Sequence, residues 1–191
     1  MPLSISIDSI PARIVRAGFH TDTCHSCGNP CGIGHNDAMT PDVQVTKEIT
    51  PDGGVVVGDD GSPAAALAIR YAAEEALRRG TTLHVIRAWT IISGIRPADL
   101  PPGIAPSMTE LETSTLEAER ARVTELVGDA DLQVDVHACY GPSAQILLKA
   151  AETADTLVVG SRGRGGFATL VLGSVAEQVV RHSTGPVIVV R

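Results

Sequence analysis

Short apolar runs alternate with longer segments of helical periodicity along the chain from residue 53 onward. The runs are rich in valine, isoleucine and leucine, which is typical of strands buried in a sheet. The segments between them repeat their apolar residues at helical spacing. The predicted strands are 54–58, 81–89, 132–139, 156–159 and 187–190.

Capping residues mark the ends of the predicted helices. A Ser-Pro pair at 62–63 is typical of a helix start, and Ser107 with Glu110 forms a capping-box pattern. On the first helix we expect the ion pairs Glu74–Arg78 and Glu75–Arg79. The helices are expected from Ser62 to Gly80, from Ser107 to near Gly128, from Ser143 to before Thr153 and from Ser174 onward, with a proline-rich loop at 90–106.

The order of these elements predicts an α/β fold. Strands that alternate with helices favour a doubly wound, five-stranded parallel sheet with helices on both faces, as in Rossmann-like domains. Apolar residues make up 43% of the chain and aromatic residues only 3%, so small aliphatic side chains must build the interior, as a buried parallel sheet requires. We expect this domain over residues 51–191 and an N-terminal extension over residues 1–50.

Charge and hydropathy narrow the classes of partner. The formal net charge of −7 argues against broad electrostatic binding of nucleic acid, which needs a basic face. No apolar run approaches the length of a membrane span, and the N-terminus lacks the pattern of a signal peptide. We therefore expect a cytoplasmic protein that binds neither nucleic acid nor membrane.

A glycine-rich loop follows the strand 156–159 and carries the candidate chemistry. It holds four glycines within the seven residues 160–166, and a helix begins shortly afterwards at Gly173–Ser174. Glycines let backbone N–H groups approach a phosphate, and a helix N-terminus adds unpaired donors. Arg162 and Arg164 are either phosphate contacts or solvated loop charges. The pattern predicts a cradle for an anion.

Two common phosphate-binding motifs do not account for this loop. A P-loop needs a lysine within its motif, and no lysine follows Lys149. The dinucleotide fingerprint matches at 163–168 but needs an acidic residue about 20 residues later. No acidic residue follows Glu177, so we reject it.

The spacing Gly-x2-Gly-x9-Gly-Ser, met by Gly160, Gly163 and Gly173–Ser174, resembles the nucleotide-binding branch of the universal stress protein family. The opening strand and turn at 54–63 are also similar to that family. The resemblance implies the strand order 3-2-1-4-5, which would bring the turn at 59–61 opposite the glycine loop at the switch point of the sheet.

The resemblance also implies roles for individual residues. Asp60 would accept hydrogen bonds from ribose hydroxyls, whereas Asp59 is either a simple turn residue or a less favoured contact. Gly58 and Val85 would lie along the adenine, which this family usually reads with backbone groups. The other matched positions are Val159, Gly160, Arg162 and Gly163 beside the ribose and α-phosphate, and Gly173, Ser174, Val175 and Ala176 at the outer phosphates. Ser174 can equally be interpreted as a helix cap.

No arrangement of catalytic residues stands out, because His84, His137 and His182 are best explained as structural and no nucleophile motif is present. We therefore expect an ATP-binding stress sensor or adaptor, with ADP or AMP as other ligands and Mg²⁺ arriving with the triphosphate. The resemblance implies a homodimer through strand 187–190, and no regulatory partner is identified. The alternatives are a weak ATPase or another enzyme that uses an adenosine nucleotide, and a structural module whose loop is empty.

The N-terminal extension holds Cys24, Cys27, Cys31 and His35, whose spacing could supply four zinc ligands. A zinc or redox regulator is thus a third alternative, although zinc is not favoured because no apolar ladder supports the knot. The other interpretations are a disordered tail and a translation start at Met39, which would make these cysteines accidental.

Overall fold

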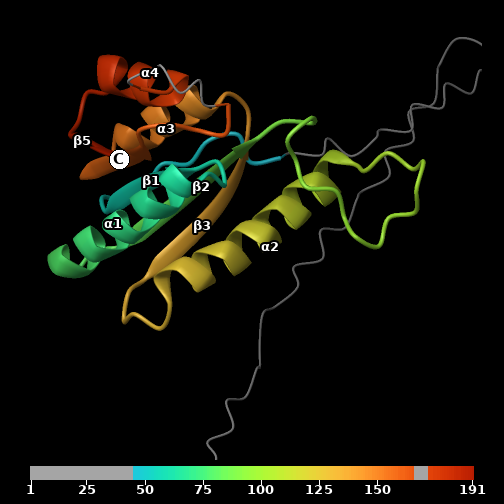
Figure 1. Ribbon diagram of the computed structural model, residues 1–191, viewed down its shortest axis with the longest axis horizontal. Helices are drawn as coiled ribbons and strands as arrows, with labels where there is room; N and C mark the ends of the chain where they lie inside the picture. Colours follow the sequence, from blue (N-terminus) through green and yellow to red (C-terminus); the bar gives the residue numbers. More distant parts are fainter. Residues whose placement is uncertain (1–44, 166–171) are drawn as a thin grey trace, which may run out of the picture. The chain divides into compact units, whose positions relative to one another are not determined.

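The computed structural model describes residues 45–165 and 172–191, and strands and helices alternate through this part of the chain (Figure 1). The predicted elements are confirmed, with ends that differ by one or two residues. They are β1 (Val55–Asp59), α1 (Pro63–Arg79), β2 (Leu83–Trp89), α2 (Met108–Val127), β3 (Val134–Tyr140), α3 (Ser143–Ala151), β4 (Thr156–Gly160), α4 (Ser174–His182) and β5 (Val187–Val190).

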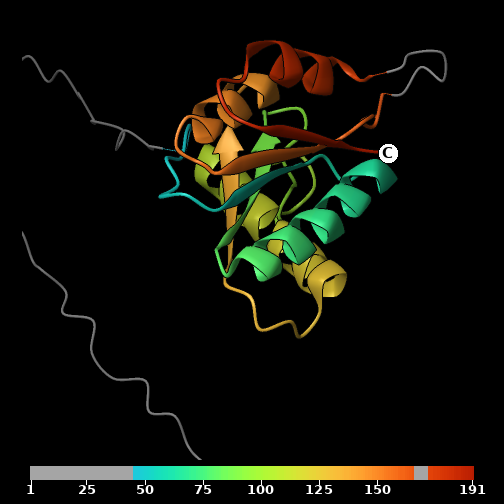
Figure 2. The same cartoon turned by 90° about the vertical axis from the view of Figure 1, so that its left-hand side faces the viewer.

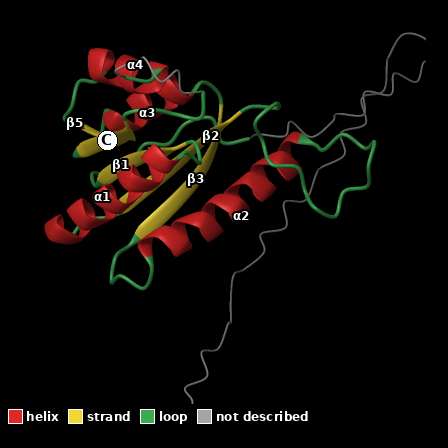
Figure 3. Ribbon diagram, in the orientation of Figure 1, coloured by secondary structure: helices red, strands yellow, loops and turns green. Residues whose placement is uncertain are grey.

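The five strands form one parallel sheet in the order β3-β2-β1-β4-β5, which confirms the predicted order (Figure 3). In the centre of the sheet, Val55 of β1 pairs with Leu83 of β2 on one side and with Thr156 of β4 on the other. The chain order reverses between β1 and β4. The carboxyl ends of these two strands therefore frame the crevice where doubly wound sheets bind ligands.

Helices cover both faces of the sheet (Figure 2). Val57 and Val85 point to one face, where they pack in a core with α1 residues and with Val123 of α2. Val56 and Ile86 point to the other face, where they join a core built with α3 and α4. Successive strand residues alternate between the faces, so each strand contributes to both cores. Burying a valine or isoleucine side chain completely stabilises a fold by roughly 1.5–3 kcal/mol.

The hydrogen bonds of the predicted capping residues are confirmed. The Ser62 hydroxyl accepts a hydrogen bond from Ala65 N–H at 3.1 Å, and Ser107 and Glu110 make both bonds of a capping box. Of the expected ion pairs on α1, Glu75–Arg79 is present at 2.6 Å. The Glu74–Arg78 pair is wrong: the Arg78 guanidinium turns to Glu75 instead, one residue closer along the helix.

Residues 45–50, which the sequence places in the N-terminal extension, contact the domain. Thr46 N–H donates to the Glu112 carboxylate at 2.7 Å, and the Thr46 carbonyl accepts from Tyr140 N–H at 2.7 Å. None of the helices in the described ranges combines the length and apolar character that crossing a membrane requires.

Candidate functional site

A cavity of about 100 Å³ lies at the carboxyl ends of β1 and β4, on the face that α3 and α4 cover. Its wall is made by the turn between β1 and α1, by residues of the loop after β4 and by the first turn of α4. Ile86, Ala88 and Leu147 are among its apolar lining residues. The two motifs found at opposite ends of the predicted domain therefore meet in one place.

The predicted site residues, with one exception, line this cavity. They are Gly58, Asp60, Val159, Gly160, Arg162, Gly163, Gly173, Ser174, Val175 and Ala176. The exception is Val85, which is fully buried in the core on the opposite face of the sheet. The next residue, Ile86, faces the cavity instead, because the pleat turns neighbouring side chains to opposite faces.

Asp60 joins the β1–α1 turn to the glycine loop. One carboxylate oxygen accepts from Ser62 N–H at 2.9 Å, and the other accepts from Arg164 N–H at 2.8 Å. The Ser62 hydroxyl adds a 3.4 Å bond to the Arg162 carbonyl. Burial alone would raise the pKa of Asp60, but the hydrogen bonds from Ser62 and Arg164 outweigh it, so the pKa is lowered. Asp60 is therefore a carboxylate at neutral pH, fit to accept bonds from hydroxyls.

The side chain of Asp59 points the other way, toward α2. It is completely buried, and it accepts from Arg122 Nε at 2.7 Å and from Gly61 N–H at 2.8 Å. Arg122 also donates to the Ser62 carbonyl at 3.3 Å, and Arg87 of β2 donates to the Asp59 carbonyl at 3.4 Å. Arg122 and Arg87 thus both bond to the turn between β1 and α1, on the side of the sheet that faces α2.

Glu119 completes this group, and its role was not predicted from the sequence. It is 4% exposed and lies beside the Asp59 carboxyl group. Burial, hydrogen bonding with Asp59 and the Asp59 charge raise the pKa of Glu119 to about 8, although the charges of Arg87 and Arg122 oppose the shift. A signal existed: Glu119 occupies a position on the buried stripe that Leu111, Thr115 and Val123 define at intervals of four residues along α2.

The glycines of the site allow close contacts with different neighbours. A side chain at Gly160 would lie 2.8 Å from the Ala64 carbonyl carbon, so this glycine lets α1 approach β4. A side chain at Gly163 would lie 2.5 Å from an Asp60 oxygen, so that glycine lets the loop reach the carboxylate. At Gly58 the added atom would lie 2.8 Å from the end of Leu147, which fills the space instead.

The first turn of α4 has backbone donors that no described side chain caps. Gly173 is the N-cap, and among the described residues no side chain caps this helix. The N–H groups of Ser174, Val175 and Ala176 are consequently open to a ligand at the positive end of the helix dipole. Ser174 is the first helical residue rather than the cap, so the interpretation of it as a simple helix cap is wrong.

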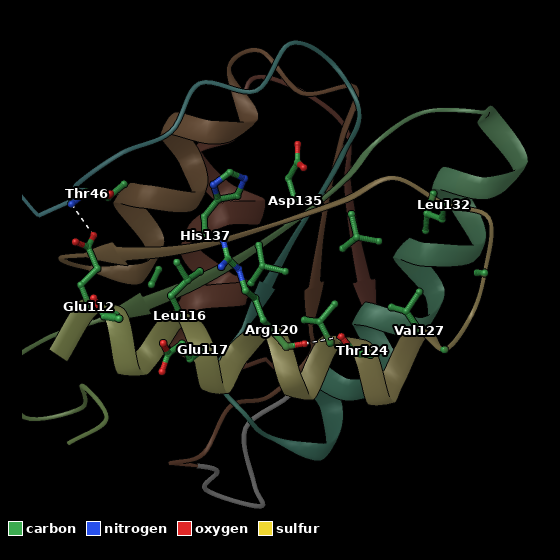
Figure 4. Close-up of a pocket in the computed structure, with 17 residues that line it drawn as sticks. Thr46, Glu112, Leu116, Glu117, Arg120, Thr124, Val127, Leu132, Asp135 and His137 are labelled. Atoms are coloured by element: carbon green, nitrogen blue, oxygen red, sulfur yellow. Dashed lines mark hydrogen bonds between the residues drawn. The ribbon is translucent and has the colours of Figure 1, made fainter. Parts of the chain in front are cut away.

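A wider groove of about 810 Å³ runs between α2 and β3 (Figure 4). Side chains such as Leu116, Arg120 and His137 line it, and none of the predicted site residues does. Over residues 45–165 and 172–191 no group of His, Cys, Asp or Glu is arranged to hold a metal ion. The predicted zinc ligands Cys24, Cys27, Cys31 and His35 lie outside the described residues.

Comparison with known proteins gives consistent matches. The model of the universal stress protein family matches residues 54–191. A universal stress protein of Mycolicibacterium smegmatis is 34% identical over 184 residues, which are 94% of this chain and 57% of that protein. Another, from Mycobacterium tuberculosis, is 40% identical over 148 residues, which are 74% of this chain and 44% of that protein. The chain thus spans about half the length of the curated relatives it matches.

Solved structures agree on the fold. A universal stress protein from Lactobacillus plantarum is 23% identical with a TM-score of 0.58, and the match covers 75% of this chain and all, 100%, of that one. A universal stress protein solved in complex with cAMP is 25% identical with a TM-score of 0.54, over 73% of this chain and 97% of that one.

Proposed function

The chain belongs to the universal stress protein family, and from this premise we propose that it binds an adenine nucleotide between β1 and β4 and acts as a nucleotide-dependent stress sensor or adaptor. One observation carries the proposal: the Asp60 carboxylate and the uncapped start of α4 face the same cavity. A carboxylate suits ribose hydroxyls, and free N–H groups at a helix start suit phosphates.

The lining supports a division of the ligand along the cavity. The base would lie beside Gly58, against the apolar side chains of Ile86, Ala88 and Leu147. The phosphates would lie beside Gly163 and the first turn of α4, with Arg162 also lining the cavity. A cavity of about 100 Å³ takes only part of a nucleotide, so the remainder would lie across its open side. The relative that was solved with cAMP supports the ligand class.

We take ATP as the preferred ligand, with ADP or AMP as weaker ones, because the N–H groups of α4 extend the site beyond a first phosphate. Mg²⁺ would then arrive with the triphosphate and be held mainly by its oxygens, since Mg²⁺ commonly binds through substrate phosphates. The chain would contribute Asp60 and the backbone N–H groups, which bind and orient the nucleotide.

The test is binding to the purified full chain. The protein is prepared without added nucleotide and denatured, and any released ligand is identified by mass spectrometry. Calorimetric titration with ATP, ADP, AMP and cAMP follows, on the wild type, on Asp60→Ala and on the control Asp99→Ala, an exposed loop carboxylate. We expect Asp60→Ala to weaken binding and Asp99→Ala to leave it unchanged. Failure of the wild type to bind any of the four would refute the proposal, and steady release of ADP would make the protein an ATPase.

We also propose that two copies pair through β5, an edge strand of the sheet. Pro186 and Val190 direct their carbonyls to β4, so the N–H of Val189 points to the open edge. An open edge is a template for pairing with another chain. Light scattering should give the mass of a dimer for the wild type and of a monomer for Val189→Pro. A monomeric wild type would contradict this assembly.

A further inference from the structure

Behind the cavity lies a buried cluster of charged side chains that the proposed function does not use. Asp59, Arg87 and Glu119 are each less than a tenth exposed and come from β1, β2 and α2. Arg122, one turn after Glu119, is partly exposed and bonds to Asp59 at 2.7 Å. These are the charged groups that face Glu119: Asp59 from β1, Arg87 from β2 and Arg122 from its own helix.

The surroundings of Glu119 favour its protonated form. Its carboxyl group lies beside that of Asp59, and the donors of the cluster, Arg122 Nε and Gly61 N–H, go to Asp59 rather than to Glu119. A proton on Glu119 therefore removes the repulsion between the two carboxyl groups. Within the described part of the chain, the Glu119 Oε1 atom is buried with no hydrogen-bond partner. Ionised Glu119 would thus place an unsatisfied charge against the Asp59 carboxylate, which is costly in a buried site.

The cluster and the nucleotide cavity share the turn between β1 and α1. Asp59 and Asp60 are consecutive, and a single turn of backbone carries the first toward Glu119 and the second toward Arg164 of the glycine loop. Arg122 donates hydrogen bonds to the same turn, at the Asp59 carboxylate and at the Ser62 carbonyl. A shift of Asp59 away from an ionised Glu119 would therefore move Asp60 and disturb its bond to the loop.

We propose that Glu119 is a positioning residue for the nucleotide site: its protonated form holds Asp59, and so the β1–α1 turn, in the binding arrangement, and its ionisation weakens nucleotide binding. The proposal rests on the proposed function, since it concerns affinity at the same site. It makes the protein's response to nucleotide depend on pH in the mildly alkaline range.

The test is calorimetric titration of the full chain with ATP at pH 7 and pH 9.5. Phosphate groups finish titrating near pH 6, so the ligand itself hardly changes in this window. Burial lowers the pKa of His84 and His137 and raises that of Cys139 to about 12, which takes these described groups out of the window as well. We expect the wild-type affinity to fall about fivefold or more, the lower end of typical coupling between sites.

Glu119→Gln keeps a donor toward Asp59 and removes the titration, so its affinity should not change by more than about twofold between the two pH values. Glu117→Gln, an exposed position on the same helix, is the matched control and should follow the wild type. Independently of nucleotide, the carboxyl carbon of Glu119 should titrate near pH 8 by NMR in the ligand-free protein.

The outcomes separate the two proposals. A wild type that binds no ATP at either pH refutes the proposed function and this inference with it. A wild type that binds equally at both pH values, or a Glu119→Gln variant that loses affinity as the wild type does, overturns the inference alone. An NMR midpoint near the ordinary value of a glutamate would overturn it without any ligand.

Discussion

Gly160 should be required for stability rather than for binding, although the motif that identifies the nucleotide site contains it. An alanine there would place its Cβ 2.8 Å from the Ala64 carbonyl carbon and 3.0 Å from Ala64 O and Ala65 N. These are backbone atoms in the first turn of α1, so no side chain can rotate away. Favourable carbon contacts lie at about 3.5–4.0 Å, and α1 must therefore move away from β4.

The cost of that movement can be bounded. Overpacking a well-packed interior costs roughly 1–3 kcal/mol, while Gly→Ala by itself stabilises by about 0.4–1 kcal/mol through the unfolded state. We therefore expect Gly160→Ala to lower the free energy of unfolding by about 1–2 kcal/mol. With a urea m-value of about 1–3 kcal/mol/M, the midpoint of a urea denaturation curve should fall by roughly 0.5–1 M.

Gly165→Ala is the matched control, because a Cβ at Gly165 in the same loop meets no atom of the described residues within 4 Å. It should leave the urea midpoint unchanged or raise it slightly. If the two variants unfold at the same urea concentration, close packing between α1 and β4 is not what requires a glycine at 160, and the steric reasoning is refuted.

Three further changes test other contacts of the site. Gly163→Ala would bring its Cβ to 2.5 Å from an Asp60 oxygen and so disturb the bond between the Asp60 carboxylate and the loop. Losing a hydrogen bond to a charged group should weaken ATP binding about tenfold in calorimetric titration. An unchanged affinity would contradict the proposed role of the loop. Arg122→Ala would remove the guanidinium that bonds to the buried Asp59 carboxylate. The free energy of unfolding in urea should fall by about 3 kcal/mol. A fall below about 1 kcal/mol would show that water replaces the guanidinium. Glu119 has a folded pKa raised from 4.5 to about 8, so its contribution to stability is fully present below pH 4.5 and is lost as the pH rises through 8. Between these values the wild type should lose about 1.4 kcal/mol per pH unit relative to Glu119→Gln in urea unfolding, and parallel curves would refute the shift.

The local elements of this fold are readable from the sequence because their signals are local. Ser62, Gly80 and the Ser107–Glu110 pair act within a few residues of themselves, and the structure confirms each as a cap. The strand order is different, since periodicity does not specify which strands pair. It followed from the family resemblance, which rests on the glycine spacing after β4.

Val85 and Ile86 show what the apolar pattern of β2 leaves open. Leu83 to Arg87 is buried on both faces of the sheet, so the run has no alternation of apolar and polar residues that would tell which side chains face which helices. A one-residue error of register exchanges the faces, and with them Val85 and Ile86. Only the packing of α3 and α4 against Ile86 decides the matter.

The adjacent pair Asp59–Asp60 explains why α2 matters to a site that it does not line. At the end of a strand, neighbouring side chains still leave the backbone in opposite directions. One carboxylate therefore faces the arginines and Glu119 on the α2 side, and the other faces the glycine loop on the α4 side. Because both belong to one turn, a change on either face is transmitted through backbone geometry without any intervening chain of contacts. An apolar residue in place of Asp59 would uncouple the two faces, and nucleotide binding would then become independent of Glu119.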